Sequence, residues 1–284
     1  MKKNKTRLSQ GIYLLPNFFT SVNLFLGFYA IIMILKAYTL QKLSFYELAK
    51  YPSNNYKTAA WAIIIATIFD TLDGRVARMT KTTSAFGLEY DSLADLTTFG
   101  MAPALLLYSW SLGYFDKLGW GLIYFDKVGG LGQIVAFLYF ACVALRLARF
   151  NVQSKTVEKE GFQGMPSPAG AGFIAAIILM NPVFLPAMKN ERLYILILPV
   201  LLALLMVSSV PYRNFKEIDF EKRFSFPVVL LIVLLIIVFY HWPVPMVFAI
   251  FTAYASSGVL ERILSIFFRK KGWTTGLRSI VSSS

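Results

Sequence analysis

Two pairs of aspartates lie close together in the chain and could perform chemistry as one group. Asp70 and Asp73 lie near the end of one apolar segment, and Asp91 and Asp95 lie near the start of the next. On an α-helix, the members of each pair fall within about 60° of each other on a single face. The connection at 79–88 is short, so the two helices are predicted to be antiparallel neighbours whose four carboxylates converge.

Four carboxylates in a low-dielectric environment repel one another strongly, unless they share protons or bind divalent cations. The chain has one histidine, His241, and one cysteine, Cys142, and both lie in other segments. Ligation by oxygen alone favours Mg²⁺ or Mn²⁺ over Zn²⁺. The alternative is a salt-bridged cluster with nearby arginines, namely Arg75, Arg78 and Arg146.

Small residues accompany the aspartates. Gly74 directly follows Asp73, Ala77 lies one turn further on, and Gly87 opens the second helix. Glycine inside a helix costs about 1 kcal/mol relative to alanine, a cost that the close approach of a ligand would offset. Arg78 ends the first helix, where its guanidinium can reach a phosphate.

The spacing from Asp70 to Asp95 is D-x2-D-G-x2-A-R-x8-G-x3-D-x3-D, with every position filled. This pattern resembles the signature of the CDP-alcohol phosphotransferase family. The resemblance implies a homodimer with about six core spans and a nucleotide packed over Gly74, Ala77 and Gly87, with Arg78 near the phosphates. It also implies that Asp95 is the base that deprotonates the acceptor hydroxyl. The implied ligands of two divalent metal ions are Asp70, Asp73, Asp91 and Asp95.

Three further segments narrow the acceptor alcohol. They read P-N-x2-T-x2-N-x3-G from Pro16, R-x-A-R-F-N from Arg146 and F-x-G-x-P-x-P-A from Phe162. Together with the aspartate motif they resemble the membrane-embedded phosphatidylserine synthases, over roughly residues 15–175. The implied reaction joins CDP-diacylglycerol and L-serine to give phosphatidylserine and CMP.

These segments supply the remaining candidate site residues. Arg146 and Arg149 lie three residues apart on one helix face, and two guanidiniums suit a carboxylate or phosphate. Positive-inside topology is the alternative explanation for both arginines. We expect the CDP-lipid to contact Thr20 and Asn23 in addition to the motif residues. We expect acceptor binding by Arg146, Arg149, Asn151, Gly164, Pro166 and Ser167, with Arg149 as the first candidate to hold the serine carboxylate and Arg146 as the second.

The elements that must position these residues are membrane helices. Of the 284 residues, 57% are hydrophobic and only 15% are charged, whereas soluble domains carry about 25% charged residues. The predicted fold is therefore an all-α polytopic transmembrane bundle of about eight spans, a six-helix core plus C-terminal helices. The apolar segments are 17–36, 57–79, 89–113, 130–152, 168–187, 191–210, 226–241 and 243–268.

The charge pattern predicts domain limits and orientation. We expect a cytoplasmic amphipathic lead-in at 1–16, a catalytic core at 17–210, and a C-terminal transmembrane hairpin with a basic tail at 211–284. The net charge of +13 comes mainly from short loops, which favours anionic lipid surfaces over nucleic acid as the partner. The Lys/Arg bias predicts a cell (inner) membrane protein whose active site faces the cytoplasm.

The sequence is also compatible with three other functions. The same chemistry could use another alcohol, such as glycerol 3-phosphate, an inositol phosphate or choline. Intramembrane carboxylates also occur in ion-coupled transporters, but transporter sites usually lie near the bilayer midplane between repeats. The aspartates here are predicted at one membrane face, and no repeat is visible. A metal-binding structural membrane protein is a third alternative, with only the carboxylates in its favour.

Overall fold

A computed structural model describes residues 2–43, 54–80, 84–112, 130–156, 164–184, 191–210, 212 and 226–270. Within these residues the chain is helical and contains no strand, which confirms the predicted all-α fold. The helices are α1 (Lys2–Leu43), α2 (Asn54–Met79), α3 (Ala85–Asp95), the π-helical turn η2 (Leu96–Met101), α4 (Ala102–Leu107), the π-helical turn η3 (Tyr108–Leu112), α6 (Leu131–Thr156), α7 (Ser167–Phe184), α8 (Glu191–Val207), α9 (Phe226–His241) and α10 (Pro243–Lys270).

Each predicted apolar segment falls on a helix. The elements from α3 to η3 follow one another without a break, where the sequence predicted a single segment at 89–113. Helix α1 passes residue 16 uninterrupted, so the predicted limit between lead-in and core is not a break in the helix. The number of membrane crossings and the domain limits stay predictions.

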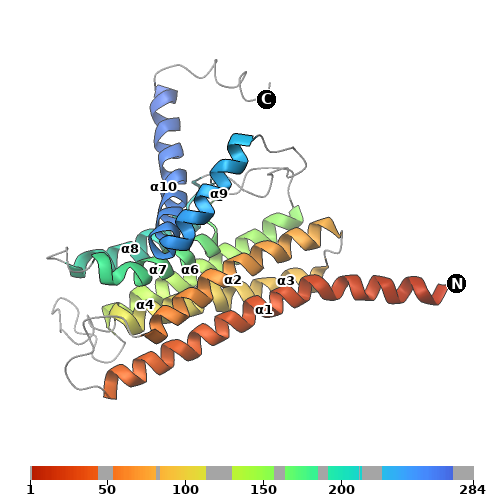
Figure 1. Cartoon of the computed structure of the whole chain (residues 1–284), viewed down its shortest axis with the longest axis horizontal. Coiled ribbons are helices and arrows are strands. Elements are labelled where there is room, and N and C mark those ends of the chain that lie inside the picture. Colours follow the sequence, from red (N-terminus) through yellow and green to blue (C-terminus); the bar gives the residue numbers. More distant parts are fainter. Residues whose placement is uncertain are drawn as a thin grey trace.

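The first two helices lie side by side along the bundle (Figure 1). Fully buried alanines occur on both, including Ala30 and Ala37 on α1 and Ala59 and Ala66 on α2. Small side chains allow the backbones of membrane helices to approach closely. The two helices therefore form a firm platform, with the aspartates of α2 near one end of it.

Larger buried side chains fill the space beyond this platform. Phe99 of η2, Tyr139 of α6, Ile174 of α7 and Met206 of α8 are all almost inaccessible. Phe99 lies one turn after Asp95 in the chain. The carboxylate-bearing end of α3 is therefore anchored directly in the hydrophobic core.

The last two helices lie to one side of this bundle, and α10 projects away from it (Figure 1). The ring of Phe251 occupies the place where a Cβ on Gly172 would lie, so α10 packs closely on α7. The ring of Tyr212 fills the same kind of space at Gly258. Helix α9 exposes most of its large apolar side chains, including Leu230, Val233, Leu234, Ile236 and Phe239.

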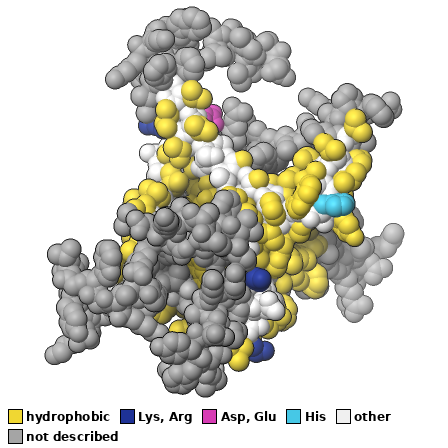
Figure 2. All heavy atoms as spheres, turned by 60° about the vertical axis from the view of Figure 1, so that its left-hand side comes forward, with side chains coloured by type: hydrophobic (Ala, Val, Ile, Leu, Met, Phe, Trp, Pro, Cys, Tyr) yellow, Lys and Arg dark blue, Asp and Glu magenta, His cyan; other side chains and the backbone are white. Residues whose placement is uncertain are grey.

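Within the part of the chain that the structure describes, three helical segments are long and apolar enough to cross a membrane: Asn17–Leu40, Leu131–Gln153 and Pro243–Leu264. Two shorter apolar helices, Ser167–Met180 and Leu196–Val207, accompany them. On the face drawn in Figure 2, the described side chains are largely hydrophobic and charged groups occur singly. Because so much apolar surface is unfavourable in water, the chain is a helical membrane protein.

Candidate active site

Three carboxylates, one from α2 and two from α3, come together in the structure. Oxygen atoms of Asp70, Asp91 and Asp95 all lie within 4.8 Å of one another. Asp95 is buried, with 7% of its surface exposed, whereas the other two are half-buried. Three negative groups at this spacing repel unless a cation or shared protons balance them.

Helix α1 supplies polar partners to the aspartates. The Nδ2 atom of Asn23 donates a hydrogen bond to Oδ1 of Asp95 at 3.1 Å. The hydroxyl of Thr20 donates to the carboxylate of Asp73, which is buried. Asp73 therefore lies on the α1 side of α2 and is not part of the cluster of three.

The π-helical turn η2 begins directly after Asp95 and is held by two buried hydrogen bonds. Thr98 donates through its hydroxyl to the carbonyl of Asn23 at 3.0 Å, and Tyr139 donates to the carbonyl of Phe99 at 3.1 Å. A Cβ on Gly27 would collide with Thr98, so glycine allows α1 to approach this closely. Such π-turns are frequent at functional sites, and this one fixes Asp95 relative to α1.

A buried cation lies within electrostatic range of the carboxylates. Arg146 of α6 has only 8% of its surface exposed, and its Nη1 atom donates to the hydroxyl of Ser167 at 2.8 Å. The guanidinium also lies within electrostatic range of Asp95 and Asp70. The aspartates and the arginine thus share one polar region inside an apolar bundle.

A tight turn before α7 sets the position of Ser167. Gly164 has a φ of 87°, in the left-handed region, and its N–H donates to the carbonyl of Val210 at 2.9 Å. The next residue, Met165, is fully buried and donates to the carbonyl of Leu205 at 3.1 Å. A Cβ on Gly164 would meet the carbonyl oxygen of Met206. Only glycine fits here, and the turn is therefore docked on the end of α8.

Comparison with known proteins agrees with this geometry. The family model described as CDP-alcohol phosphatidyltransferase matches residues 13–255. The chain belongs to the CDP-alcohol phosphatidyltransferase family.

Several similar proteins share one name. The chain is 36% identical over 212 residues to a CDP-diacylglycerol--serine O-phosphatidyltransferase of Helicobacter pylori, covering 75% of this chain and 77% of the relative. It is 36% identical over 171 residues to the protein of the same name from Methanocaldococcus jannaschii, covering 60% and 71%. The protein of that name from Saccharomyces cerevisiae is 34% identical over 164 residues, covering 54% of this chain and 49% of the relative.

CDP-alcohol phosphatidyltransferases generally use divalent metal ions, and the donor atoms of this family member fit such an ion. The three clustered carboxylates offer the hard oxygen ligands that Mg²⁺ and Mn²⁺ prefer. The Oδ1 atom of Asn23 is buried and has no hydrogen-bond partner among the described residues. An unsatisfied amide oxygen costs stability when buried, and it belongs to the same amide that binds Asp95.

The residues predicted to bind the CDP-lipid lie around this cluster. Thr20 and Asn23 contact two of the motif aspartates, as described above. Gly87 lies in the first turn of α3, where its N–H donates to the Ser84 hydroxyl that caps the helix. Gly74 is half-buried on α2. The side chains of Ala77 and Arg78, on the last turns of α2, lie outside the described part of the structure.

The predicted acceptor residues divide into two groups. Arg146 and Ser167 are buried and bond to each other, and Arg146 lies within electrostatic range of Asp95 and Asp70. Pro166 precedes α7, and its carbonyl accepts hydrogen bonds from the N–H groups of residues 169 and 170. Arg149 instead donates to the carbonyl of Val207 at the end of α8, at 3.3 Å. The amide of Asn151 donates to Ser92 at 2.9 Å and to Glu89 at 3.4 Å.

Two tyrosines near the site were not predicted from the sequence. The hydroxyls of Tyr139 and Tyr254 lie within electrostatic range of Arg146. Tyr254 belongs to α10, which lies in the predicted C-terminal region at 211–284, outside the predicted catalytic core. A tyrosine in an apolar helix has no spacing that distinguishes it from a packing residue, so no sequence signal could have identified it.

Proposed function

We propose that this chain transfers the phosphatidyl group of CDP-diacylglycerol to the hydroxyl of L-serine, giving phosphatidylserine and CMP. The observation that carries the proposal is the placement of a buried guanidinium, Arg146, beside the cluster of Asp70, Asp91 and Asp95. The cluster suits a pyrophosphate donor and the guanidinium suits a carboxylate-bearing acceptor. The names and identities of the relatives support the same reaction.

The donor side is proposed to work with two divalent ions, Mg²⁺ or Mn²⁺. Asp70, Asp91 and Asp95 would hold them, and Asp73, close by on α2, completes the predicted set of ligands. Bound there, the ions would neutralise negative charge on the pyrophosphate and on the departing CMP. Thr20 and Asn23 orient two of these carboxylates through the hydrogen bonds described above.

Asp95 is the proposed general base. Its carboxylate accepts the proton of the serine hydroxyl, and the freed oxygen attacks the phosphorus that carries the diacylglycerol. The bond from that phosphorus to CMP breaks, and CMP leaves with the electron pair. A base must lie within about 3 Å of the proton it removes, and the amide of Asn23 fixes Asp95 in one orientation for this purpose.

The acceptor side is proposed to hold the serine carboxylate on Arg146. This guanidinium is buried and close to Asp95, so a bound serine can direct its hydroxyl toward the base. Arg149 and Asn151 lie one turn further along α6, with Gly164, Pro166 and Ser167 in and after the facing turn. We assign them to the walls of the acceptor site.

Basic residues near the aspartates support a cytoplasmic location for the site. Arg75 and Arg78 lie on the same end of α2 as the aspartates, and Lys81 follows directly. Basic residues concentrate on the cytoplasmic side of membrane proteins, so we assign this end of the bundle to the cytoplasm and the protein to the inner membrane. A homodimer is proposed from the family resemblance.

Other acceptors are less well supported by the charge of the site. Glycerol 3-phosphate or an inositol phosphate carries a phosphate and would favour a dense basic pocket. Among the described residues, Arg146 is the buried cation at the site. One guanidinium matches the single carboxylate of serine better.

An acceptor panel tests the proposal. Purified full-length protein in detergent is supplied with CDP-diacylglycerol, Mg²⁺ or Mn²⁺, and serine, glycerol 3-phosphate or inositol phosphate, and CMP release is measured. Release that depends on serine is the expected result. Equal or faster release with a phosphorylated acceptor would refute serine while leaving the reaction class intact. An absence of CMP release with every acceptor would refute the proposed reaction.

A further inference from the structure

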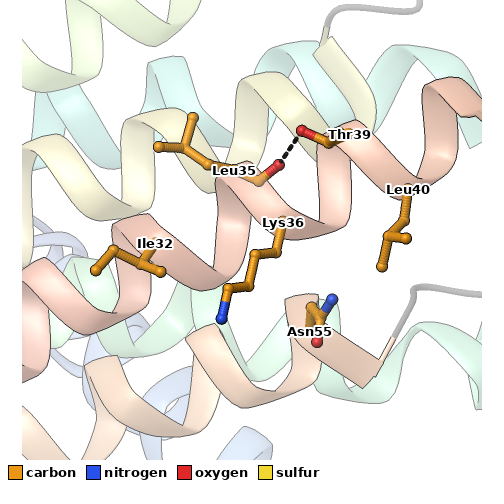
Figure 3. A pocket seen from close by; sticks show the side chains of 6 residues that line it. All are labelled: Ile32, Leu35, Lys36, Thr39, Leu40 and Asn55. Atoms are coloured by element: carbon orange, nitrogen blue, oxygen red, sulfur yellow. Dashed lines mark hydrogen bonds between the residues drawn. The ribbon is translucent and has the colours of Figure 1, made fainter.

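A groove of about 500 Å³ lies between the C-terminal half of α1 and the first turn of α2 (Figure 3). It lies at the opposite end of these helices from the aspartates. Lys36 in the groove and Thr20 at the active site are both on α1. At a rise of 1.5 Å per residue, they are separated by about 24 Å along the helix axis. The hydrocarbon core of a bilayer is about 30 Å thick. The groove therefore lies near the membrane surface opposite the active site. Its lining residues are Ile32, Leu35, Lys36, Thr39, Leu40 and Asn55.

The walls of the groove are mainly apolar and face outward. Leu35 and Leu40 are 57% and 54% exposed, on the helical segment Asn17–Leu40 that can cross a membrane. Side chains exposed on such a segment contact lipid rather than water. A groove of this kind is open to acyl chains from the side.

The polar groups in the groove can donate hydrogen bonds to an anion. Figure 3 shows the side chain of Lys36 extending from α1 toward α2, where Asn55 lies on the facing turn. The hydroxyl of Thr39 donates to the carbonyl of Leu35 at 2.9 Å, which leaves Lys36 and Asn55 as the donors. None of the lining residues is acidic, and the first turn of α2 contains no acidic residue.

Lys36 is exposed, and a lysine near the membrane surface packs its stem on apolar side chains while its ammonium group reaches the level of the lipid phosphates. We propose that the groove binds one anionic phospholipid of the leaflet opposite the active site. Its phosphate accepts hydrogen bonds from Lys36 and Asn55, and an acyl chain lies along Ile32, Leu35 and Leu40. This molecule complements both the single positive charge and the apolar walls, whereas a soluble anion would leave the leucines uncovered.

Lipid binding is independent of turnover, so this inference stands or falls separately from the proposed function. The experiment is native mass spectrometry of the purified full-length protein with added dioleoyl phosphatidylglycerol. The test variant is Lys36→Gln. The matched control is Lys57→Gln, which removes the same charge two residues after Asn55 and outside the groove lining.

We expect Lys36→Gln to weaken binding of one lipid by about tenfold or more, which corresponds to the loss of one charge-assisted hydrogen bond. Lys57→Gln should bind as the unmodified protein does. Leu35→Trp, which fills the groove without changing its charge, should also lose the lipid. Lys36→Gln and Leu35→Trp should both keep the thermal stability of the unmodified protein.

Three results would overturn the proposal. Equal lipid binding by the two lysine variants would show that Lys36 has no special role. Complete displacement of the lipid by millimolar inorganic phosphate would show a simple anion site. A change in the monomer–dimer ratio of Leu35→Trp, with lipid binding unchanged, would identify the groove as a contact between copies of the chain.

Discussion

The two halves of the site are built in different ways. In the carboxylate half, Asp70, Asp91 and Asp95 come from consecutive helices separated by a short connection. In the guanidinium half, Arg146 of α6 is held by Ser167 of α7. The turn before Ser167 is in turn fixed by backbone carbonyls at the end of α8.

This difference shows how the two halves depend on the rest of the fold. Asp91 and Asp95 share one face of α3 and therefore keep their relative positions, and a short connection joins α3 to the helix that carries Asp70. The position of Arg146 depends instead on the packing of several helices, so changes far from the site should affect the acceptor more than the donor.

Removal of divalent ions should have the largest effect. Three carboxylates within 4.8 Å of one another repel unless a cation or shared protons balance them, so an excess of EDTA should reduce CMP release to background. Added Mg²⁺ or Mn²⁺ should restore it. Undiminished CMP release in excess chelator would contradict the metal-dependent scheme.

Asp95→Asn should reduce kcat by about 10²–10⁴, the usual contribution of a general base. The asparagine keeps the size of the side chain and can still bond to Asn23, so CDP-diacylglycerol binding should be largely retained. Asp70→Ala should lose both turnover and donor binding. The measurements are steady-state CMP release and direct binding of the CDP-lipid. Near-normal turnover in Asp95→Asn would place the base elsewhere.

Arg146→Gln should raise the KM for serine by about 10- to 100-fold, because a charge-assisted hydrogen bond contributes about 1.5–3 kcal/mol. The KM for CDP-diacylglycerol should change little. Arg149→Gln is the matched comparison, since this arginine lies one turn further along α6 and contacts the carbonyl of Val207. Its effect on serine should be smaller. A larger effect at Arg149 would exchange the roles of the two arginines.

The carboxylate half could largely be predicted from the sequence. Helix periodicity and a short connection were enough to bring Asp70, Asp91 and Asp95 together, and this convergence is confirmed. The same reasoning placed Asp73 with them, whereas its carboxylate accepts a hydrogen bond from Thr20 and lies outside the cluster of three. That contact depends on where α1 packs, which the spacing on α2 does not indicate.

The guanidinium half was predicted less completely. The sequence named Arg146 and Ser167 as candidates but could not show that they bond to each other. They lie on different helices, and helix periodicity does not predict contacts between helices. The π-helical turn after Asp95 was also missed. Nothing in Leu96–Met101 distinguishes it from an ordinary helix, and the hydrogen bonds that hold it come from α1 and α6.

The smallest predicted effect tests whether α10 reaches the acceptor. Tyr254 lies within electrostatic range of Arg146, and its ring lies 5.7 Å from that of Tyr212. Tyr254→Phe keeps the ring and removes the hydroxyl, so the serine KM should rise about two- to fivefold, as for one neutral hydrogen bond. The KM for CDP-diacylglycerol and the thermal stability should not change.

Tyr212→Phe is the control for this last prediction, because it removes a tyrosine hydroxyl from the same aromatic pair. That hydroxyl donates to the carbonyl of Ala255 at 3.1 Å and therefore supports α10 itself. We expect Tyr212→Phe to lower the unfolding temperature slightly and to leave the serine KM unchanged. If the two variants shift the serine KM equally, then α10 acts on the site only by supporting the fold. A shift confined to Tyr254→Phe would instead show that the guanidinium half extends into the C-terminal hairpin.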